Sequence, residues 1–256
     1  MKLLDLTLDS PAENLACDEA LLDLCENEGV EILRFWESRQ HFVVVGYGNR
    51  IESEVNVKEC QRRGIPILRR CSGGGTVVQG PGCLSYNLTL KIPDSGLLTT
   101  VTGTNAFVME RNRAALAELL GMRVSVQGHT DLAFTQWVGR DVDALVVPHS
   151  RWFKFSGNAQ RRRRQAIVFH GTILYDFDLR VISELLRFPS MQPGYREDRS
   201  HAEFVANIPT RRNSISAALR AVWSAQQIFT APPSERIDQL RRDHYENDAW
   251  TLRHGH

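Results

Sequence analysis

Three short blocks of the chain carry residue types that suit the binding and activation of an anionic substrate. The first is RRCSGGGTVV, in which Arg69 and Arg70 precede three consecutive glycines. Glycines let the backbone approach a ligand closely, and their amide groups can line an anion, while arginines add forked donors. The alternative interpretation is a flexible surface turn. Three consecutive glycines lose much conformational entropy when the chain folds, and this cost favours a binding loop over a mere turn. The candidate residues are Arg70, Ser72, Gly73, Gly74, Gly75 and Thr76.

The second block is KFSGNAQ, which Arg161 follows directly. Lys154 lies in an apolar, strand-like stretch between Phe153 and Phe155. Taken alone, such a lysine more often extends its ammonium to water than into a site. If it faces a cleft instead, its compact charge suits a phosphate or a carbonyl oxyanion.

The third block is FHGTIL, with His170, Gly171 and Thr172. A lone histidine in a strand is more often a structural residue than a catalyst. Between the second and third blocks, residues 161–164 are four consecutive arginines, which we interpret mainly as a solvated hairpin tip. Docking of an acidic protein partner is the alternative for this run, because clustered charge steers association.

The segments that must position these blocks alternate between strand and helix patterns. Ser10 and Pro11 are a typical helix start, and Gly64 and Gly121 are typical helix ends. Several hairpins interrupted by helices predict an α+β fold, with one mainly antiparallel sheet flanked by helices. Strands are predicted at 3–8, 31–36, 42–45, 65–69, 76–78, 84–92, 153–155 and 166–175, and helices at 10–25, 55–63, 104–120, 181–187, 214–228 and 234–243.

The bulk composition narrows the class of protein. A chain of 256 residues fits one large domain, and its net charge of +1 gives no basic excess for binding nucleic acid. No apolar run reaches the roughly 18 residues of a membrane span, and the N-terminus lacks a signal-peptide pattern. The five cysteines are scattered, without metal-ligand spacing, which is typical of reduced thiols in a cytoplasmic protein.

Together and in this order, the three blocks resemble the lipoate–protein ligase family. The resemblance begins at Asn14-Leu15-Ala16 and extends to about residue 185. It implies a class II biotin/lipoate ligase-like α+β fold. We therefore expect residues 1–256 to be a single catalytic domain, with a core over 1–185, a helical part over 186–256 and no accessory C-terminal domain.

The resemblance also implies a role for individual residues. Lys154 resembles the essential lysine of the family, and Asp131 an aspartate near the nucleotide and a metal ion. Arg161 matches an arginine near the acyl chain. The other implied substrate- and nucleotide-binding residues are Arg70, Ser72, Gly73, Gly74, Gly75, Thr76, Ser156, Gly157, Ala159, His170, Gly171 and Thr172.

A ligase of this family uses ATP and Mg²⁺ to convert lipoate or octanoate to an acyl-AMP. It then passes the acyl group to a lysine of a lipoyl carrier domain, of a 2-oxoacid dehydrogenase E2 or a glycine-cleavage H-like protein. A separate accessory subunit is a further possible partner. The chemistry needs a lysine because one ammonium can neutralise the carboxylate and the α-phosphate as they approach.

Besides the expected lack of an accessory domain, three departures from the family pattern keep alternatives open. Gly80-Pro81-Gly82-Cys83 replaces an aspartate–x–glycine–asparagine pattern, Thr130 stands where an asparagine is expected, and 139–150 resembles an inserted loop. An ATP-independent octanoyl or lipoyl transferase is the first alternative, although no cysteine follows Cys83 to serve as a nucleophile. A biotin ligase is disfavoured because a GRGRxG motif is missing, and a non-catalytic acyl-carrier or nucleotide-binding module is the last.

Overall fold

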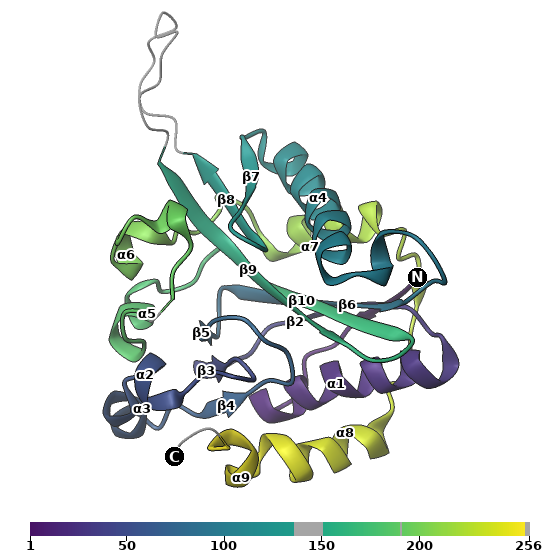
Figure 1. Ribbon diagram of the computed structural model, residues 1–256, viewed down its shortest axis with the longest axis horizontal. Coiled ribbons are helices and arrows are strands. Elements are labelled where there is room, and N and C mark those ends of the chain that lie inside the picture. Colours follow the sequence, from purple (N-terminus) through teal and green to yellow (C-terminus); the bar gives the residue numbers. More distant parts are fainter. Residues whose placement is uncertain (136–150, 190, 254–256) are drawn as a thin grey trace, which may run out of the picture.

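A large sheet runs through the molecule and carries the candidate residues Asp131, Lys154 and His170 (Figure 1). This computed structural model describes residues 1–135, 151–189 and 191–253. The sheet has eight strands in the order β11-β1-β2-β6-β10-β9-β8-β7. β1 runs parallel to both of its neighbours, and all other neighbouring pairs are antiparallel. The strands are β1 (Lys2–Asp5), β2 (Ile32–Trp36), β6 (Cys83–Lys91), β7 (Val124–Gln127), β8 (Asp131–Thr135), β9 (Trp152–Arg162), β10 (Ala166–Leu174) and β11 (Gln227–Ile228).

Helices cover both faces of this sheet, which confirms the predicted α+β class with a mainly antiparallel sheet. One face is covered by α1 with α8 outside it, and the other by α4 and α7 (Figure 1). Between the sheet and α4 lies the largest buried apolar cluster, which includes Phe155 and Phe169. The helices are α1 (Pro11–Glu28), α4 (Val101–Leu120), α7 (Arg212–Val222) and α8 (Ser234–Leu240), followed by the π-helical turn η3 (Arg241–Tyr245) and α9 (Asp248–Thr251).

A second, three-stranded sheet with the order β4-β3-β5 holds the glycine-rich loop between two of its strands. The loop leaves β4 after Arg69 and enters β5 at Val77. Short helices pack beside this sheet, two of them between β3 and β4 and one after β10. The elements are β3 (Phe42–Val45), α2 (Ile51–Glu54), α3 (Val57–Arg63), β4 (Ile67–Arg69), β5 (Val77–Gln79) and α5 (Arg180–Leu185); η1 (Leu97–Thr99), η2 (Gly194–Arg196) and α6 (His201–Phe204) complete the described elements.

Local signals explain where α1 begins and ends. The Ser10 side chain accepts from the backbone of Glu13, and the Glu13 carboxylate accepts in return from Ser10 N–H. This reciprocal pair satisfies two amide groups that a helix start leaves without partners. At the other end Gly29 adopts the left-handed conformation with φ of 70°, which terminates the helix.

Several element boundaries differ from the sequence prediction. The predicted edge strand at 3–8 is β1, which pairs on both sides. The predicted helix at 55–63 begins only at Val57, because Val55 is extended, and the separate short helix α2 precedes it. The predicted helix at 214–228 ends at Val222, and its last residues form β11 instead. The predicted strand at 153–155 is the start of the long β9, and β7 and β8 were not predicted. The predicted inserted loop at 139–150 lies outside the described residues.

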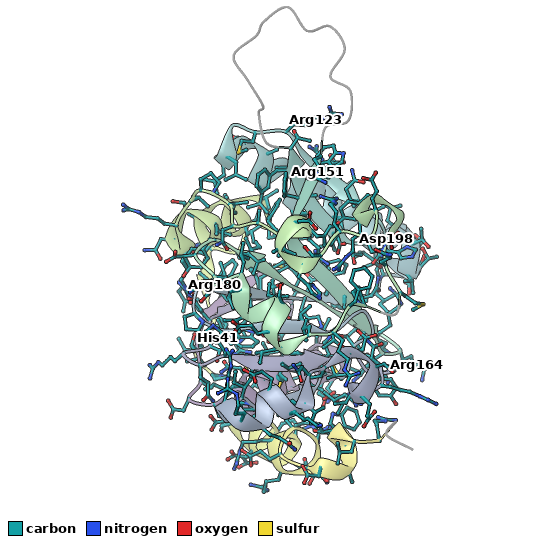
Figure 2. The ribbon with its side chains drawn as sticks, turned by 90° about the vertical axis from the view of Figure 1, so that its left-hand side faces the viewer. His41, Arg123, Arg151, Arg164, Arg180 and Asp198 are labelled. Carbon is teal, nitrogen blue, oxygen red and sulfur yellow. The ribbon has the colours of Figure 1, made fainter. Side chains whose placement is uncertain are left out.

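The tip of the β9–β10 hairpin is shorter than the arginine run indicates. Arg161 and Arg162 belong to β9 and pair with Val168 and Ile167 of β10. Arg162 donates to Leu98 O, at 2.8 Å, on one face of the sheet. Three of the four arginines are nevertheless exposed, namely Arg161, Arg163 and Arg164, which agrees with the predicted solvated run, and Figure 2 shows Arg164 at the edge of the molecule. Within the described residues, no helix is long and apolar enough to cross a membrane.

A buried guanidinium joins α1 to the sheet. Arg34 of β2 has no exposed surface, and its Nη1 lies 2.6 Å from Asp18 Oδ1 of α1. It also donates to Asn14 O at 2.8 Å, to Asn14 Oδ1 at 2.6 Å and to Leu6 O at 3.0 Å. A buried charge is tolerated when it is paired and hydrogen-bonded in this way. Arg34 therefore fixes the position of α1 over the sheet.

Replacing this arginine should strongly destabilise the fold. Arg34→Met would leave the Asp18 carboxylate buried without its cation, at a cost of about 3–5 kcal/mol in the free energy of unfolding. Urea denaturation measures this change. Arg62→Met is the matched control, because the Arg62 side chain is 66% exposed and its ion pair with Glu59 lies in water. Equal midpoints for the two variants would contradict the role assigned to Arg34.

Candidate active site

An irregularity in β9 decides which way Lys154 points. Leu132 of β8 pairs with Ser156, but the next residue, Ala133, pairs with Lys154, so Phe155 is an extra residue in β9. In a regular strand Lys154 and Ser156 would share a face. The extra residue is a β-bulge, which re-aims the side chain next to it. Lys154 therefore points to the face of Gly157, opposite to the apolar cluster that contains Phe155.

On that face, Lys154 forms an ion pair with an aspartate of the neighbouring strand. Its Nζ lies 2.8 Å from Asp131 Oδ1, and the two side chains are 25% and 15% exposed. The hydroxyl of Tyr195 donates to Asp131 Oδ2 at 2.9 Å. A Cβ built on Gly157 would lie 2.9 Å from Lys154 Nζ, so the ammonium lies directly over this glycine. Lys154 and Asp131 are thus brought together, as expected for two site residues.

The Arg70 guanidinium stabilises the conformation of the glycine-rich loop by hydrogen bonds. Its Nη2 donates to Gly73 O at 2.6 Å and to Gly75 O at 2.7 Å, and its Nε donates to Ser72 Oγ at 3.1 Å. Burial lowers the pKa of Arg70 to about 10, so the guanidinium remains charged at neutral pH. The loop carbonyls therefore face this arginine.

The loop packs on β9 beside the lysine. Gly74 has φ of +85°, and a Cβ built on it would lie 3.4 Å from Ala159 Cβ. Ala159 follows Gly157 by two residues, so both lie on one face of the strand. Gly46 supports the loop from behind, because a Cβ at this position would lie 2.0 Å from Gly74 O. The structure therefore brings the glycine-rich loop and the Lys154–Asp131 pair to the same face of β9.

His170 connects this loop to α1. It pairs with Ala159 across β10 and β9, and its Nε2 lies 2.5 Å from Ser72 Oγ. Its Nδ1 lies 3.8 Å from Asp18 Oδ2, on the other side of the ring. A histidine held between a hydroxyl and a carboxylate is fixed in orientation. His170 thus orders the loop, as a member of the predicted site.

The charge of Asp18 depends on the same contacts. Burial alone would raise the pKa of Asp18, but the charge of Arg34 and the contact with His170 outweigh it, and the net pKa is lowered. A carboxyl whose pKa is lowered by folding stabilises the fold above its unfolded pKa of about 3.9. That contribution is lost as the pH falls through the lower folded value.

The other predicted residues divide between the two faces of the sheet. Thr172 pairs with Gly157 and shares its face, and Thr76 Oγ1 lies 3.4 Å from Asn49 Nδ2 beside the loop.

Two of the predicted residues, Ser156 and Gly171, lie on the opposite face of the sheet. Ser156 Oγ accepts a hydrogen bond from Asn158, and a Cβ on Gly171 would collide with the same asparagine. Asn158 also accepts a hydrogen bond from Tyr86 OH. These residues therefore support the site from behind.

The metal assignment rests on one carboxylate. Among the described residues there is no group of three or more histidine, cysteine, aspartate or glutamate side chains that could hold an ion. Mg²⁺ is commonly held by one or two carboxylates together with substrate phosphates and water. Asp131 fits such a shared ion.

The thiols are poorly suited to act as nucleophiles. All five cysteines are buried, and burial raises the pKa of Cys71 and of Cys83 to about 12. The thiolate is the reactive form, so these groups are protonated at neutral pH.

Sequence reasoning missed three residues at this site. Tyr195, Gly46 and Asp18 have no motif of their own, and their importance comes from contacts between distant segments. Asp18 had a local signal, because it lies in the Asn14–Ala20 stretch that carries the family resemblance. Tyr195 had none, because it lies outside the stretch, up to about residue 185, that carries the family resemblance.

Comparison with known protein families gives evidence on the chain's family that is independent of the site geometry. Residues 10–231 match the family model described as the lipoyl protein ligase A/B catalytic domain. The chain belongs to this family. The predicted family and enzyme class are therefore confirmed: the protein is a lipoate–protein ligase or a related lipoyl or octanoyl transferase.

Its relatives include both kinds of enzyme. The octanoyltransferase LipM of Brevibacillus brevis is 25% identical over 95% of this chain and 95% of its own length. A putative lipoate-protein ligase A of Aeropyrum pernix is 27% identical over 89% of this chain and 76% of its own.

The fold is that of solved ligases. A bi-partite lipoate protein ligase from Thermoplasma acidophilum superposes with a TM-score of 0.80 at 23% identity, covering 99% of this chain and 96% of that one. A lipoate-protein ligase A bound with ATP superposes with a TM-score of 0.77 at 22% identity, covering 99% and 98%. These similarities confirm the predicted fold family.

A methyl group at Gly46 should displace the glycine-rich loop. Gly46→Ala would force Gly74 O away and cost about 1–3 kcal/mol in the free energy of unfolding, as overpacking does. We expect it to reduce acyl-transfer activity more than Gly48→Ala, because a Cβ at Gly48 meets nothing within 4 Å. Activity assays and melting temperatures of both variants check this. Equal activity in the two would show that the loop position does not matter.

Proposed function

We propose that this protein is a lipoate–protein ligase that activates lipoate or octanoate with ATP and transfers the acyl group to a carrier lysine. The observation that carries the proposal is the shared face of β9, on which the Lys154 ammonium and the glycine-rich loop lie together. The thiols, which a cysteine-based transfer would need as thiolates, are buried and protonated.

The first step is formation of the acyl-adenylate. A carboxylate oxygen of the acid attacks the α-phosphorus of ATP, and pyrophosphate leaves. Both reactants are anions, so their approach needs a cation between them. Lys154 supplies an ammonium group that is partly buried, and a charge that is partly shielded from water attracts both anions more strongly. The exposed edge of the glycine loop offers backbone amides to the phosphates. Mg²⁺ held by Asp131 and the phosphates would offset the remaining negative charge.

The second step is transfer to the carrier. The neutral carrier amine attacks the acyl carbon, AMP leaves with its phosphate charge, and the amine nitrogen loses one proton to solvent as the amide forms. Lys154 is then placed to stabilise the oxyanion that forms on the acyl oxygen. We expect the acceptor to be a lipoyl domain, and the solved bi-partite ligase that this chain resembles was studied with its E2 lipoyl domain. The proposal treats residues 1–256 as one catalytic unit whose C-terminal helices pack on α1.

An ATP-independent octanoyltransferase is the second candidate. It is favoured by the octanoyltransferase LipM relatives, of which that of Brevibacillus brevis matches this chain over 95% of both lengths. Such a transfer would use the same lysine for the oxyanion but would need an activated acyl donor in place of ATP. It would have to proceed without a thiolate in the described site, or with Cys71 exposed by a rearrangement.

Loss of the lysine should abolish turnover without unfolding the protein. In Lys154→Met, the carboxylate and phosphate would meet without a cation, and we expect kcat to fall by roughly 10²–10³-fold or more. The test is a mass-shift assay with an apo lipoyl domain, lipoate, ATP and Mg²⁺. Lys58→Met, at an exposed position on α3, should behave as wild type. Normal turnover in the Lys154 variant would refute the site.

The choice between ligase and transferase can be made with the same assay. We expect acylation with lipoate and ATP, and none with an octanoyl-loaded carrier in the absence of ATP. Cys71→Ser should remain active, since the ligase mechanism does not use this thiol. Acylation only from the loaded carrier, together with an inactive serine variant, would support a thiol-dependent transferase instead.

A further inference from the structure

A path of buried hydrogen bonds lies behind the candidate site. It begins at Trp223, at the C-terminal end of α7, whose Nε1 donates to Asn112 Oδ1 of α4 at 2.8 Å. Asn112 Nδ2 donates to the hydroxyl of Tyr86 at 2.9 Å, and that hydroxyl donates to Asn158 Oδ1 of β9. The side chains of Tyr86, Asn112 and Trp223 are all buried. Helices α7 and α4 and strands β6 and β9 are thus joined by one continuous polar path.

The path ends beside the ion pair of Lys154 and Asp131. Asn158 Nδ2 donates to Thr130 O at 2.6 Å, and Thr130 Oγ1 donates to Asn158 O at 2.7 Å. Thr130 closes the turn between β7 and β8, and Asp131 is the first residue of β8. The position of this turn therefore determines where the carboxylate that pairs with Lys154 lies.

The direction of every hydrogen bond in this path is fixed by its two ends. An indole N–H can only donate and a peptide carbonyl can only accept, so Trp223 is the first donor and Thr130 O the last acceptor. Between them, each asparagine turns its oxygen toward Trp223 and its nitrogen toward Thr130. The Tyr86 oxygen accepts from Asn112, so its single proton is directed at Asn158.

The Tyr86 proton selects one of the two orientations of the Asn158 carboxamide. In the observed orientation all its polar groups are used, since Nδ2 also donates to Ser156 Oγ at 3.2 Å. In the reversed orientation the side-chain oxygen would face Thr130 O, and two oxygens without a proton between them repel each other. The turn that precedes Asp131 would then lose its contact with β9.

The apolar core does not need these polar groups. Tyr86 and Trp223 belong to the largest buried apolar cluster, where purely apolar rings would avoid the cost of desolvating a hydroxyl or an indole N–H. Gly171 provides the space for the network, because a Cβ there would lie 1.7 Å from Asn158 Oδ1 and 2.9 Å from Tyr86 Cε1. A buried polar network that is fully satisfied makes its surroundings rigid and specifies one arrangement. Here that rigidity reaches the strand that carries Lys154.

We propose that Tyr86 is a positioning residue for acyl transfer: through Asn158 it fixes the turn that places Asp131 against Lys154. The inference rests on the proposed function and extends it to a residue that lies on the opposite face of the sheet from the ammonium. Catalytic groups must be held within about 0.5 Å of their productive geometry, and supporting hydrogen bonds provide this precision. A misplacement of about 1 Å can lower a rate by roughly 100-fold.

Steady-state kinetics of Tyr86→Phe, with an apo lipoyl domain, lipoate, ATP and Mg²⁺, test the proposal. The variant loses one hydroxyl and keeps the ring, so we expect a folded protein whose kcat is roughly 10- to 100-fold lower. The KM of lipoate should change by less than about twofold, because the loss affects the transition state and not the binding of the acid. Tyr175→Phe is the matched control: its hydroxyl donates to Glu37, outside this path, and its kcat should equal that of wild type.

The same substitution in an Asp131→Asn background separates positioning from a general loss of structure. Without the carboxylate that Tyr86 positions, Tyr86→Phe should lower kcat by less than about twofold. A residue that acted only on stability would lower kcat by the same factor in both backgrounds. Hydrogen exchange of the Asn158 side-chain amide, followed by NMR, needs no activity and should be at least roughly tenfold faster in Tyr86→Phe.

Four results would overturn the proposal: an unchanged kcat in Tyr86→Phe, an equal loss in Tyr175→Phe, equal losses with and without Asp131, or unchanged exchange of the Asn158 amide. The proposed ligase function fails separately, if the wild type acylates the carrier only from an octanoyl-loaded donor without ATP. The same variants are then compared with that donor, because both candidate reactions use Lys154. A normal kcat of Tyr86→Phe there would refute the positioning role as well.

Discussion

One extra residue in a strand is the constraint on which the site depends. Because Phe155 is bulged, Lys154 leaves the face that its position in a regular strand would give it and joins Asp131, Gly157 and the glycine-rich loop. The aromatic side chain of Phe155 stays in the apolar cluster, where its burial stabilises the bulge. The strand thus supplies both a core residue and a charged residue within two consecutive positions.

Buried guanidinium groups shape the loops around that lysine. Arg34 fixes α1, Arg69 binds the carbonyls of 46–49, and Arg70 binds those of the glycine-rich loop. Each uses backbone carbonyls as acceptors, so each determines a backbone conformation and not only a contact between side chains. Small residues complete this arrangement, since Gly46 and Gly74 approach too closely for any side chain. The glycines are therefore needed as much for packing as for ligand binding.

Much of the fold, and part of the candidate site, can be predicted from the sequence. The α+β class, the glycine-rich loop after a strand and the start of α1 are set by local patterns, and the predictions for them are confirmed. The bulge could not be predicted, because its only trace is a change in alternation around Phe155 that the apolar neighbours obscure. Tyr195 was missed since its contact with Asp131 joins segments 64 residues apart. Of the residues predicted at the site, Lys154, Gly157 and Ala159 lie on the face of β9 that meets the loop, whereas Ser156 and Gly171 lie on the opposite face.

The most direct test of this account is a crystal structure of the protein with a non-hydrolysable acyl-adenylate analogue. We predict that Lys154 Nζ lies within about 3.2 Å of a phosphate oxygen of the analogue, with the backbone amides of the glycine-rich loop directed at the same phosphate. An analogue bound on the opposite face of β9, or an ammonium that still contacts only Asp131, would contradict the account.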